Sequence, residues 1–244
     1  MNVLVLGSTS VIGMHLAAAF ASGNNLLLTG RNPVRLSDAA GHCREAGACS
    51  VVEFPCDLGA DCSELLVTTA GWNPDVIINA ASATSQLRDD AIAFDDFSSV
   101  VRVDLLAPLD LLHSLVARRN GQPLRVVFVS SALAAVRSPR RAIYGSLKRV
   151  HEQALVSLSK KRPEVQVLIA RLSKVISPRQ SSREALRFAA TVRDSFDRGR
   201  TYMSFGWSGR LVTGLFFVQP LAFYLVVDLA RAARRWGRKM GRDR

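Results

Sequence analysis

The stretch MNVLVLGSTSVIG, residues 1–13, decides the fold. Its residues 2–6 form an apolar run that stops at Gly7, and a helical pattern of apolar residues begins near Gly13. A short apolar run, a glycine turn and a helix in this order are typical of the start of a βαβ unit. Backbone N–H groups at the N-terminus of such a helix favour the binding of a phosphate group. The stretch therefore predicts an α/β fold with a phosphate site after its first strand.

The alternation of strand and helix continues along the chain. Further apolar runs with the length of strands lie at residues 25–29, 50–54, 75–79, 125–130 and 165–171. Helical patterns cover residues 31–46, 63–70, 94–117, 144–160 and 181–200. Strands that alternate with helices predict a parallel sheet covered on both faces. We therefore expect a doubly wound, Rossmann-type domain over residues 1–200, followed by an apolar, basic C-terminal helical extension over residues 201–244.

The extension has an unusual composition. Residues 211–227 are almost uninterrupted apolar residues, and residues 231–244 hold seven basic residues and one Asp, which supply half of the chain's net charge of +12. Three interpretations of the apolar segment stay open: a core or dimer-interface helix, a hairpin in one membrane leaflet, or the mouth of an apolar pocket. Basic residues around Trp236 favour contact of residues 211–244 with an anionic membrane surface. No nucleic-acid partner is expected, because no base-reading motif accompanies the charge.

The cysteines indicate a reducing compartment. Cys43, Cys49, Cys56 and Cys62 form no CxxC pair and have no metal-like spacing with histidine, so we expect free thiols and no metal. No signal peptide precedes the first apolar run. The expected location is the cytoplasm, peripheral on the inner membrane face if the tail binds there.

The first turn is the expected cofactor site. Its candidate residues are Gly7, Ser8, Thr9, Ser10, Ile12 and Gly13. The middle glycine of a dinucleotide-binding turn is missing, since Ser10 or Val11 stands in its place. We expect the hydroxyl groups of Ser8, Thr9 and Ser10 to donate to the phosphate instead.

The ends of the next strands refine this site. Arg31 follows the second strand, where an acidic residue would accept from a ribose 2′-hydroxyl and an arginine complements a 2′-phosphate. Arg31 therefore favours NADP(H) over NAD(H), unless it is only a solvated residue at the start of a helix. Asp57 and Leu58 end the third strand, where the carboxylate is expected to accept from the adenine amino group. Asn79, Ala80 and Ala81 end the fourth, where small residues let a cofactor lie close.

A second constellation points to proton transfer. The fifth strand ends in Ser130-Ser131, and Tyr144 and Lys148 lie four residues apart on one face of the next helix. A phenol has a pKa of about 10, too high for acid–base catalysis near neutral pH. A lysine ammonium one turn away, together with an oxidised nicotinamide, favours the phenolate. Tyr144 is then able to protonate a carbonyl oxygen, and a strand-end serine is able to hold that oxygen.

These motifs together resemble the short-chain dehydrogenase/reductase family, from Asn2 to about Pro178. The resemblance implies a catalytic Ser131–Tyr144–Lys148 triad, with Ser130 as the alternative if the register differs by one. It also implies an NADP(H)-dependent interconversion of a ketone and a secondary alcohol, a small-molecule substrate and a homo-oligomer. Asp104 stands where the family often has an Asn that supports a proton-relay water, and Leu172-Ser173 replaces a frequent Pro-Gly.

The resemblance leaves alternatives. Residues 7–13 and 171–175 are also similar to the extended branch, which implies a nucleotide-sugar epimerase or dehydratase with tightly bound NAD. The Ser–Tyr spacing of thirteen residues and the short C-terminal region favour the short branch. The departures at Val11, Asp104 and 172–173 also leave open a non-catalytic dinucleotide-binding sensor or scaffold. Residues 211–244 resemble in character the C-terminus of reductases of polyprenyl-phosphate-linked keto-sugars, which implies a lipid-linked carbonyl or alcohol substrate.

Overall fold

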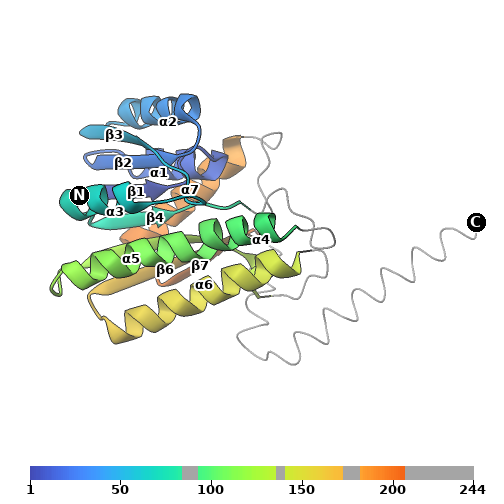
Figure 1. Cartoon of the computed structure of the whole chain (residues 1–244). Helices are drawn as coiled ribbons and strands as arrows, with labels where there is room; N and C mark the ends of the chain where they lie inside the picture. The colour runs from blue at the N-terminus through green and yellow to red at the C-terminus, as the bar shows by residue number, and fades with distance from the viewer. Residues whose placement is uncertain (84–92, 136–140, 173–181, 207–244) are drawn as a thin grey trace, which may run out of the picture.

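One parallel sheet organises the molecule (Figure 1). The computed structural model describes residues 1–83, 93–135, 141–172 and 182–206. The strands are β1 (Asn2–Leu6), β2 (Asn25–Gly30), β3 (Ser50–Pro55), β4 (Val76–Asn79), β5 (Leu124–Ser131), β6 (Val165–Leu172) and β7 (Tyr202–Phe205). The helices are α1 (Val11–Ala19), α2 (Pro33–Glu45), α3 (Ser63–Trp72), α4 (Phe94–Val101), α5 (Ala107–Arg118), α6 (Ala142–Lys161) and α7 (Ser182–Asp197), with a π-helical turn η2 (Arg102–Leu106) and a 3-10 turn η3 (Ala132–Ala134).

The strand order is β3-β2-β1-β4-β5-β6-β7, and every neighbouring pair is parallel. The order reverses between β1 and β4, so the loops after these two strands leave the sheet in opposite directions. Such a switch point, at the carboxyl ends of the strands, forms the binding crevice in doubly wound folds. The Gly7 turn follows β1 and Ala80 follows β4, which places both predicted cofactor segments at this crevice.

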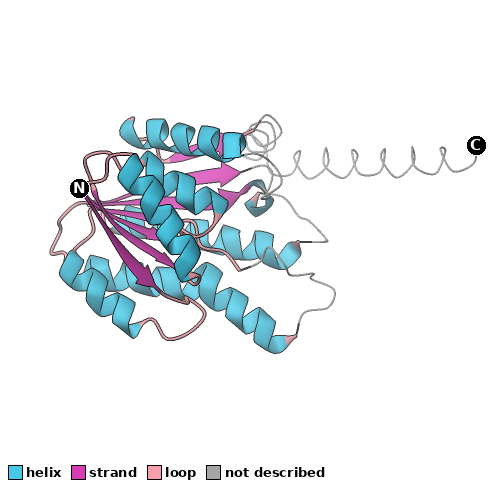
Figure 2. Cartoon of the chain, turned by 90° about the horizontal axis from the view of Figure 1, so that it is seen from above, coloured by secondary structure: helices cyan, strands magenta, loops and turns pink. Residues whose placement is uncertain are grey.

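The sheet is buried because its strands present apolar residues to both faces. In β1, Val3 and Val5 belong to a core cluster with α1, α2 and α7, whereas Leu4 and Leu6 belong to a second cluster with α3, α5 and α6. Residues alternate between faces along a strand, so the continuous apolar run of β1 serves both clusters. Figure 2 shows the two helical layers from above.

The doubly wound parallel fold predicted from the sequence is confirmed, with two differences in detail. Residues 202–205 form β7, which pairs with β6 and extends the sheet beyond the expected boundary at residue 200. The helix expected at 94–117 is divided into α4, η2 and α5. Residues 207–244, which include the apolar segment and the basic tail, lie outside the described residues. Among the helices that are described, none has the length and apolar character needed to cross a membrane.

Candidate active site

The turn after β1 requires its two glycines. Gly7 has φ +77°, and a Cβ there would lie 2.7 Å from the Cα of Ala81. A Cβ on Gly13 would lie 2.1 Å from the carbonyl oxygen of Gly7. The first glycine thus lets the turn pass against the loop after β4, and the second lets α1 begin close to the strand. The N-terminus of α1 consequently points into the crevice, as phosphate binding requires.

The serine hydroxyls of this turn serve the turn itself. Ser8 is fully buried, and its hydroxyl donates to the carbonyl oxygen of Thr29 at 2.9 Å. The Ser10 hydroxyl donates to the Gly7 carbonyl at 3.0 Å and accepts from the Gly13 N–H at 2.9 Å, so it caps α1. The Ser8 hydroxyl is thus already engaged with β2, and its expected donation to a phosphate stays a prediction. Ser10 compensates for the missing middle glycine by fixing the helix start.

A cavity of about 280 Å³ lies at this crevice. Of the predicted residues, it is lined by Gly7, Thr9, Ser10, Arg31, Asp57, Leu58, Ala80 and Ala81. Ser8, Ile12, Gly13 and Asn79 are not among its lining residues. Asn79 instead shapes the loop, because its side-chain oxygen accepts from the Ala81 N–H at 3.2 Å.

The cavity also brings in residues that the sequence analysis missed. Arg35, in the first turn of α2, lines it together with Ser82 and Val103. Its place at the start of the helix that follows β2, four residues after Arg31, is a signal that could have identified Arg35. Both arginines are exposed, so their guanidinium groups form a positive corner at the rim. This corner suits a phosphate group better than a neutral ribose hydroxyl.

Close packing of α6 against η3 brings the predicted catalytic segments together. A Cβ on Gly145 would lie 2.6 Å from the Leu133 carbonyl oxygen, so the glycine allows the start of α6 to approach η3. Arg149 Nε donates to the Ala134 carbonyl at 2.6 Å and secures the same contact. Ser131 caps η3, and Tyr144 directly precedes Gly145, so the two predicted catalytic residues belong to the two elements in contact. The Ser131 hydroxyl accepts from the Leu133 N–H at 3.2 Å, which leaves its hydrogen for a substrate oxygen.

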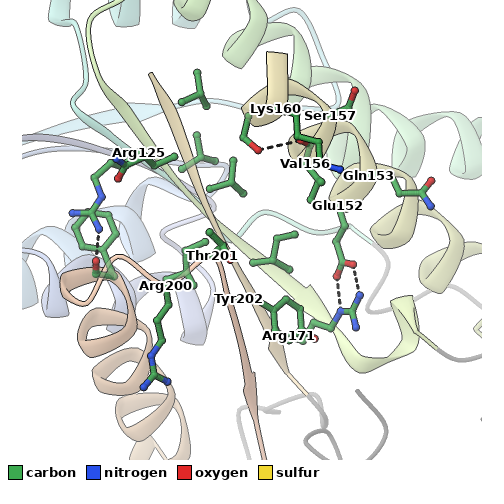
Figure 3. A pocket seen from close by; sticks show the side chains of 18 of the residues that line it. Arg125, Glu152, Gln153, Val156, Ser157, Lys160, Arg171, Arg200, Thr201 and Tyr202 are labelled. Atoms are coloured by element: carbon green, nitrogen blue, oxygen red, sulfur yellow. Dashed lines mark hydrogen bonds and ion pairs between the residues drawn. The ribbon is translucent and has the colours of Figure 1, made fainter. Parts of the chain in front are cut away.

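The structure distinguishes Ser130 from Ser131. The Ser130 hydroxyl donates to Glu152 Oε1 at 2.5 Å. Glu152 in turn accepts from Arg171 Nε at 2.8 Å and from Arg171 Nη2 at 2.5 Å, as the dashed lines in Figure 3 show. These three buried side chains connect β5, α6 and β6. Ser130 is therefore engaged in a structural network, and Ser131 is the better candidate for binding substrate.

Lys148 is an almost fully buried cation, with 2% of its side chain exposed. Its Nζ lies 3.2 Å from Asp104 Oδ1, 5.7 Å from the centre of the Tyr144 ring and 5.0 Å from that of Phe128. Burial lowers the pKa of Lys148, but its electrostatic interactions with Asp104, Tyr144 and Glu152 outweigh burial and raise it. The ammonium therefore stays charged beside the half-buried phenol.

The π-helical turn η2 places Asp104. Pro108 lies four residues further on and has no N–H group, so it cannot donate to the Asp104 carbonyl within the helix. That carbonyl instead accepts from His151 Nδ1 at 2.9 Å. Burial lowers the pKa of His151 to about 4, so the ring is neutral and carries its proton on Nδ1. His151 also stacks on Phe128, with ring centres 4.1 Å apart.

A larger groove, of about 1020 Å³, runs beside α6 along β6 and β7 (Figure 3). Glu152 and Arg171 lie at one end of it, and Arg125 and Arg200 at the other. The groove follows the face of the sheet, whereas Tyr144 and Ser131 lie at the carboxyl ends of the strands. The smaller cavity at the β1–β4 switch point is therefore the one that fits a dinucleotide site.

Comparison with known proteins agrees with this geometry. A family model described as short chain dehydrogenase matches residues 1–171. The 11-beta-hydroxysteroid dehydrogenase-like 4A of Arabidopsis thaliana is 27% identical over 152 residues, which cover 60% of this chain and 51% of that protein. The chain spans about half the length of the curated relatives it matches.

Two solved structures share the fold. One is a short-chain dehydrogenase from Sphingobium yanoikuyae in complex with NADPH, with a TM-score of 0.72 and 20% identity, covering 83% of this chain and 87% of that one. The other is a bulky-bulky ketone specific alcohol dehydrogenase from Comamonas testosteroni, with a TM-score of 0.72 and 19% identity, covering 83% and 85%.

Proposed function

The chain belongs to the short-chain dehydrogenase family, and we propose that it is an NADP(H)-dependent oxidoreductase that interconverts a ketone and a secondary alcohol. The observation that carries the proposal is the buried Lys148 ammonium, 5.7 Å from the ring of a half-buried phenol. An ammonium in this position stabilises the phenolate that remains when Tyr144 gives up its proton. The phenol stands in the first turn of α6, which packs against the η3 turn that Ser131 caps.

The residues around that cavity fit NADP(H). The N-terminus of α1, with Gly7 and Gly13, suits the pyrophosphate, and Arg31 and Arg35 suit a 2′-phosphate. The bound cofactor supplies or accepts a hydride. The NADPH complex of the Sphingobium protein supports this assignment, because that protein has the same fold.

The side chains then perform the proton transfer. In reduction, the Ser131 hydroxyl donates a hydrogen bond to the carbonyl oxygen, and the Tyr144 hydroxyl transfers its proton to the same oxygen as the carbonyl carbon is reduced. The Lys148 ammonium stabilises the phenolate left behind. In oxidation the same groups act in reverse, with Tyr144 as the base.

We extend the proposal to a lipid-linked keto-sugar as substrate, held at a membrane surface by residues 211–244. Its support is the composition of that segment, seventeen mostly apolar residues followed by a basic tail. Each basic residue near an anionic surface contributes about 1 kcal/mol at most, and salt weakens this part. Full-length protein should sediment with anionic phospholipid vesicles and less with zwitterionic ones. Protein that stays in the supernatant with both vesicles contradicts the membrane contact.

Cofactor stoichiometry tests the reaction. We incubate the purified protein with NADPH and a panel of ketones that includes keto-sugars. One NADP⁺ should form for each alcohol, and the loss of absorbance at the reduced nicotinamide band measures it. An epimerase with bound NAD would convert a nucleotide-sugar without net change in cofactor. Conversion of a sugar without consumption of NADPH, or the absence of turnover with bound NADPH, contradicts the proposal.

A further inference from the structure

Asp104 and Lys148 form a buried ion pair inside the candidate active site. The carboxylate has no exposed surface, and its Oδ1 lies 3.2 Å from Lys148 Nζ. A buried charge is stable only when an opposite charge or several hydrogen bonds accompany it. The pair spans 44 residues of sequence and joins η2 to the first turns of α6.

The other carboxylate oxygen of Asp104 contacts the cofactor side of the site. Oδ2 accepts from the Ala83 N–H at 2.8 Å. Ala83 follows Ala80, Ala81 and Ser82, which line the cofactor cavity. One side chain therefore connects the ammonium beside Tyr144 with the loop against which a cofactor would lie.

The remaining charged groups around Lys148 are balanced elsewhere. Glu152, on α6, is paired with Arg171 at 2.5 Å. His151, on the same helix, is neutral because burial lowers its pKa to about 4. Within the part of the chain that the structure describes, Tyr144 is the remaining titratable group that acts on the ammonium. Asp104 is thus the carboxylate that offsets the charge of Lys148.

We propose that Asp104 is a positioning residue that fixes Lys148 beside Tyr144 and, by offsetting part of its charge, sets the pH range over which Tyr144 changes from proton donor to proton acceptor. This inference rests on the proposed function of the site. An ammonium without a counterion stabilises a nearby phenolate more strongly than a paired one.

The charge-removing variant Asp104→Asn tests the proposal. Alcohol oxidation requires the phenolate, so the rise of kcat/KM for oxidation with pH should move to lower pH by about one unit in this variant. Asp104→Glu keeps the charge and should keep the wild-type pH range, with a lower kcat because the ammonium is displaced. Asp96→Asn removes a charge from the exposed face of α4 and should change neither property. Coincident pH profiles for Asp104→Asn and wild type overturn the proposal.

A second measurement needs no turnover and therefore separates failure of this inference from failure of the proposed function. The pKa of Lys148 is raised in the folded protein, so its pairing stabilises the fold below the unfolded-chain pKa of about 10.4 and is lost as pH rises through the folded value. In Asp104→Asn, burial without a counterion lowers that pKa. The difference in Tm between this variant and wild type should be on the order of 10 °C at pH 7 and shrink to less than half by pH 10.5. A gap that is constant with pH shows a merely structural contact and overturns the charge role.

Discussion

The two halves of the site are built in different ways. The cofactor half consists of a backbone turn between two glycines and an exposed arginine pair, and within each of these two groups the residues lie close in sequence. The catalytic half consists of buried charged side chains paired across distant elements, such as Lys148 with Asp104 and Glu152 with Arg171. Substitutions in the first half should therefore impair binding, whereas those in the second should impair chemistry or folding.

The largest effect is expected for Tyr144→Phe. The change removes one hydroxyl from a half-buried ring, so folding and NADPH affinity should stay close to wild type. Loss of a positioned general acid should lower turnover by about 10²–10⁴-fold. Steady-state kinetics and NADPH titration of the same preparation measure both effects. Turnover within a few-fold of wild type would show that Tyr144 is not the general acid, and would contradict the proposed difference between the two halves of the site.

Arg171→Met should be the most destabilising change. It leaves the Glu152 carboxylate buried without its cation, which typically costs about 3–5 kcal/mol. The double variant Glu152→Gln/Arg171→Met removes both charges and should regain much of the lost free energy of unfolding. Denaturant unfolding compares the three proteins. A cost below about 1 kcal/mol for the single variant would show that the buried pair is unimportant for the fold.

Two helical glycines provide a matched pair in the cofactor half. Gly13→Ala places a Cβ at 2.1 Å from the Gly7 carbonyl, so the turn must shift, at a cost of about 1–3 kcal/mol, and NADPH binding should weaken severely. Gly41→Ala, in α2, meets nothing within 4 Å and should stabilise the protein by about 0.5–1 kcal/mol. Calorimetry with and without NADPH gives both quantities. Unchanged NADPH affinity in Gly13→Ala would show that the turn after β1 does not take part in cofactor binding.

The smallest effect is expected for Arg31 and Arg35, the two arginines at the rim of the cofactor cavity. Arg31→Ala and Arg35→Ala should each reduce the preference for NADPH over NADH by about ten- to a hundredfold, since a charge-assisted hydrogen bond contributes about 1.5–3 kcal/mol. Arg44→Ala removes a charge from the far end of α2, where Arg44 pairs with Glu53 at 3.0 Å, and should leave the preference intact. Equal affinities for the two cofactors in wild type would refute the 2′-phosphate assignment.

The parts of the fold that could be predicted from the sequence are those determined by residues close to one another in the chain. The apolar runs and the glycine turn predicted six of the strands and that they run parallel, because strand length and turn chemistry are encoded in neighbouring residues. Tyr202–Phe205 escaped prediction since four residues with a polar serine lack a strand pattern, and only pairing with β6 makes them a strand. The break at η2 also escaped, although Pro108 was its local cause.

The catalytic half was less predictable because its contacts are distant in sequence. Tyr144 and Lys148 were recognisable from their helical spacing, but the choice between Ser130 and Ser131 needed Glu152, 22 residues away. The ion pair between Asp104 and Lys148 and the hydrogen bond from His151 depend on how η2 packs against α6. The residues expected to contact a membrane, 211–244, lie outside the described residues, and that expectation stays a prediction.

Hydride transfer itself is the most direct test of the account. NADPH carrying deuterium at C4 of the nicotinamide, in either stereochemical form, is incubated with the full-length protein and a ketone that it turns over. We expect one of the two forms to transfer deuterium to the carbinol carbon of the product, with one NADP⁺ formed per alcohol. The Tyr144→Phe variant should show the same NADPH binding without the transfer. Alcohol formed without deuterium from either form, or equal transfer by the Tyr144→Phe variant, would contradict it.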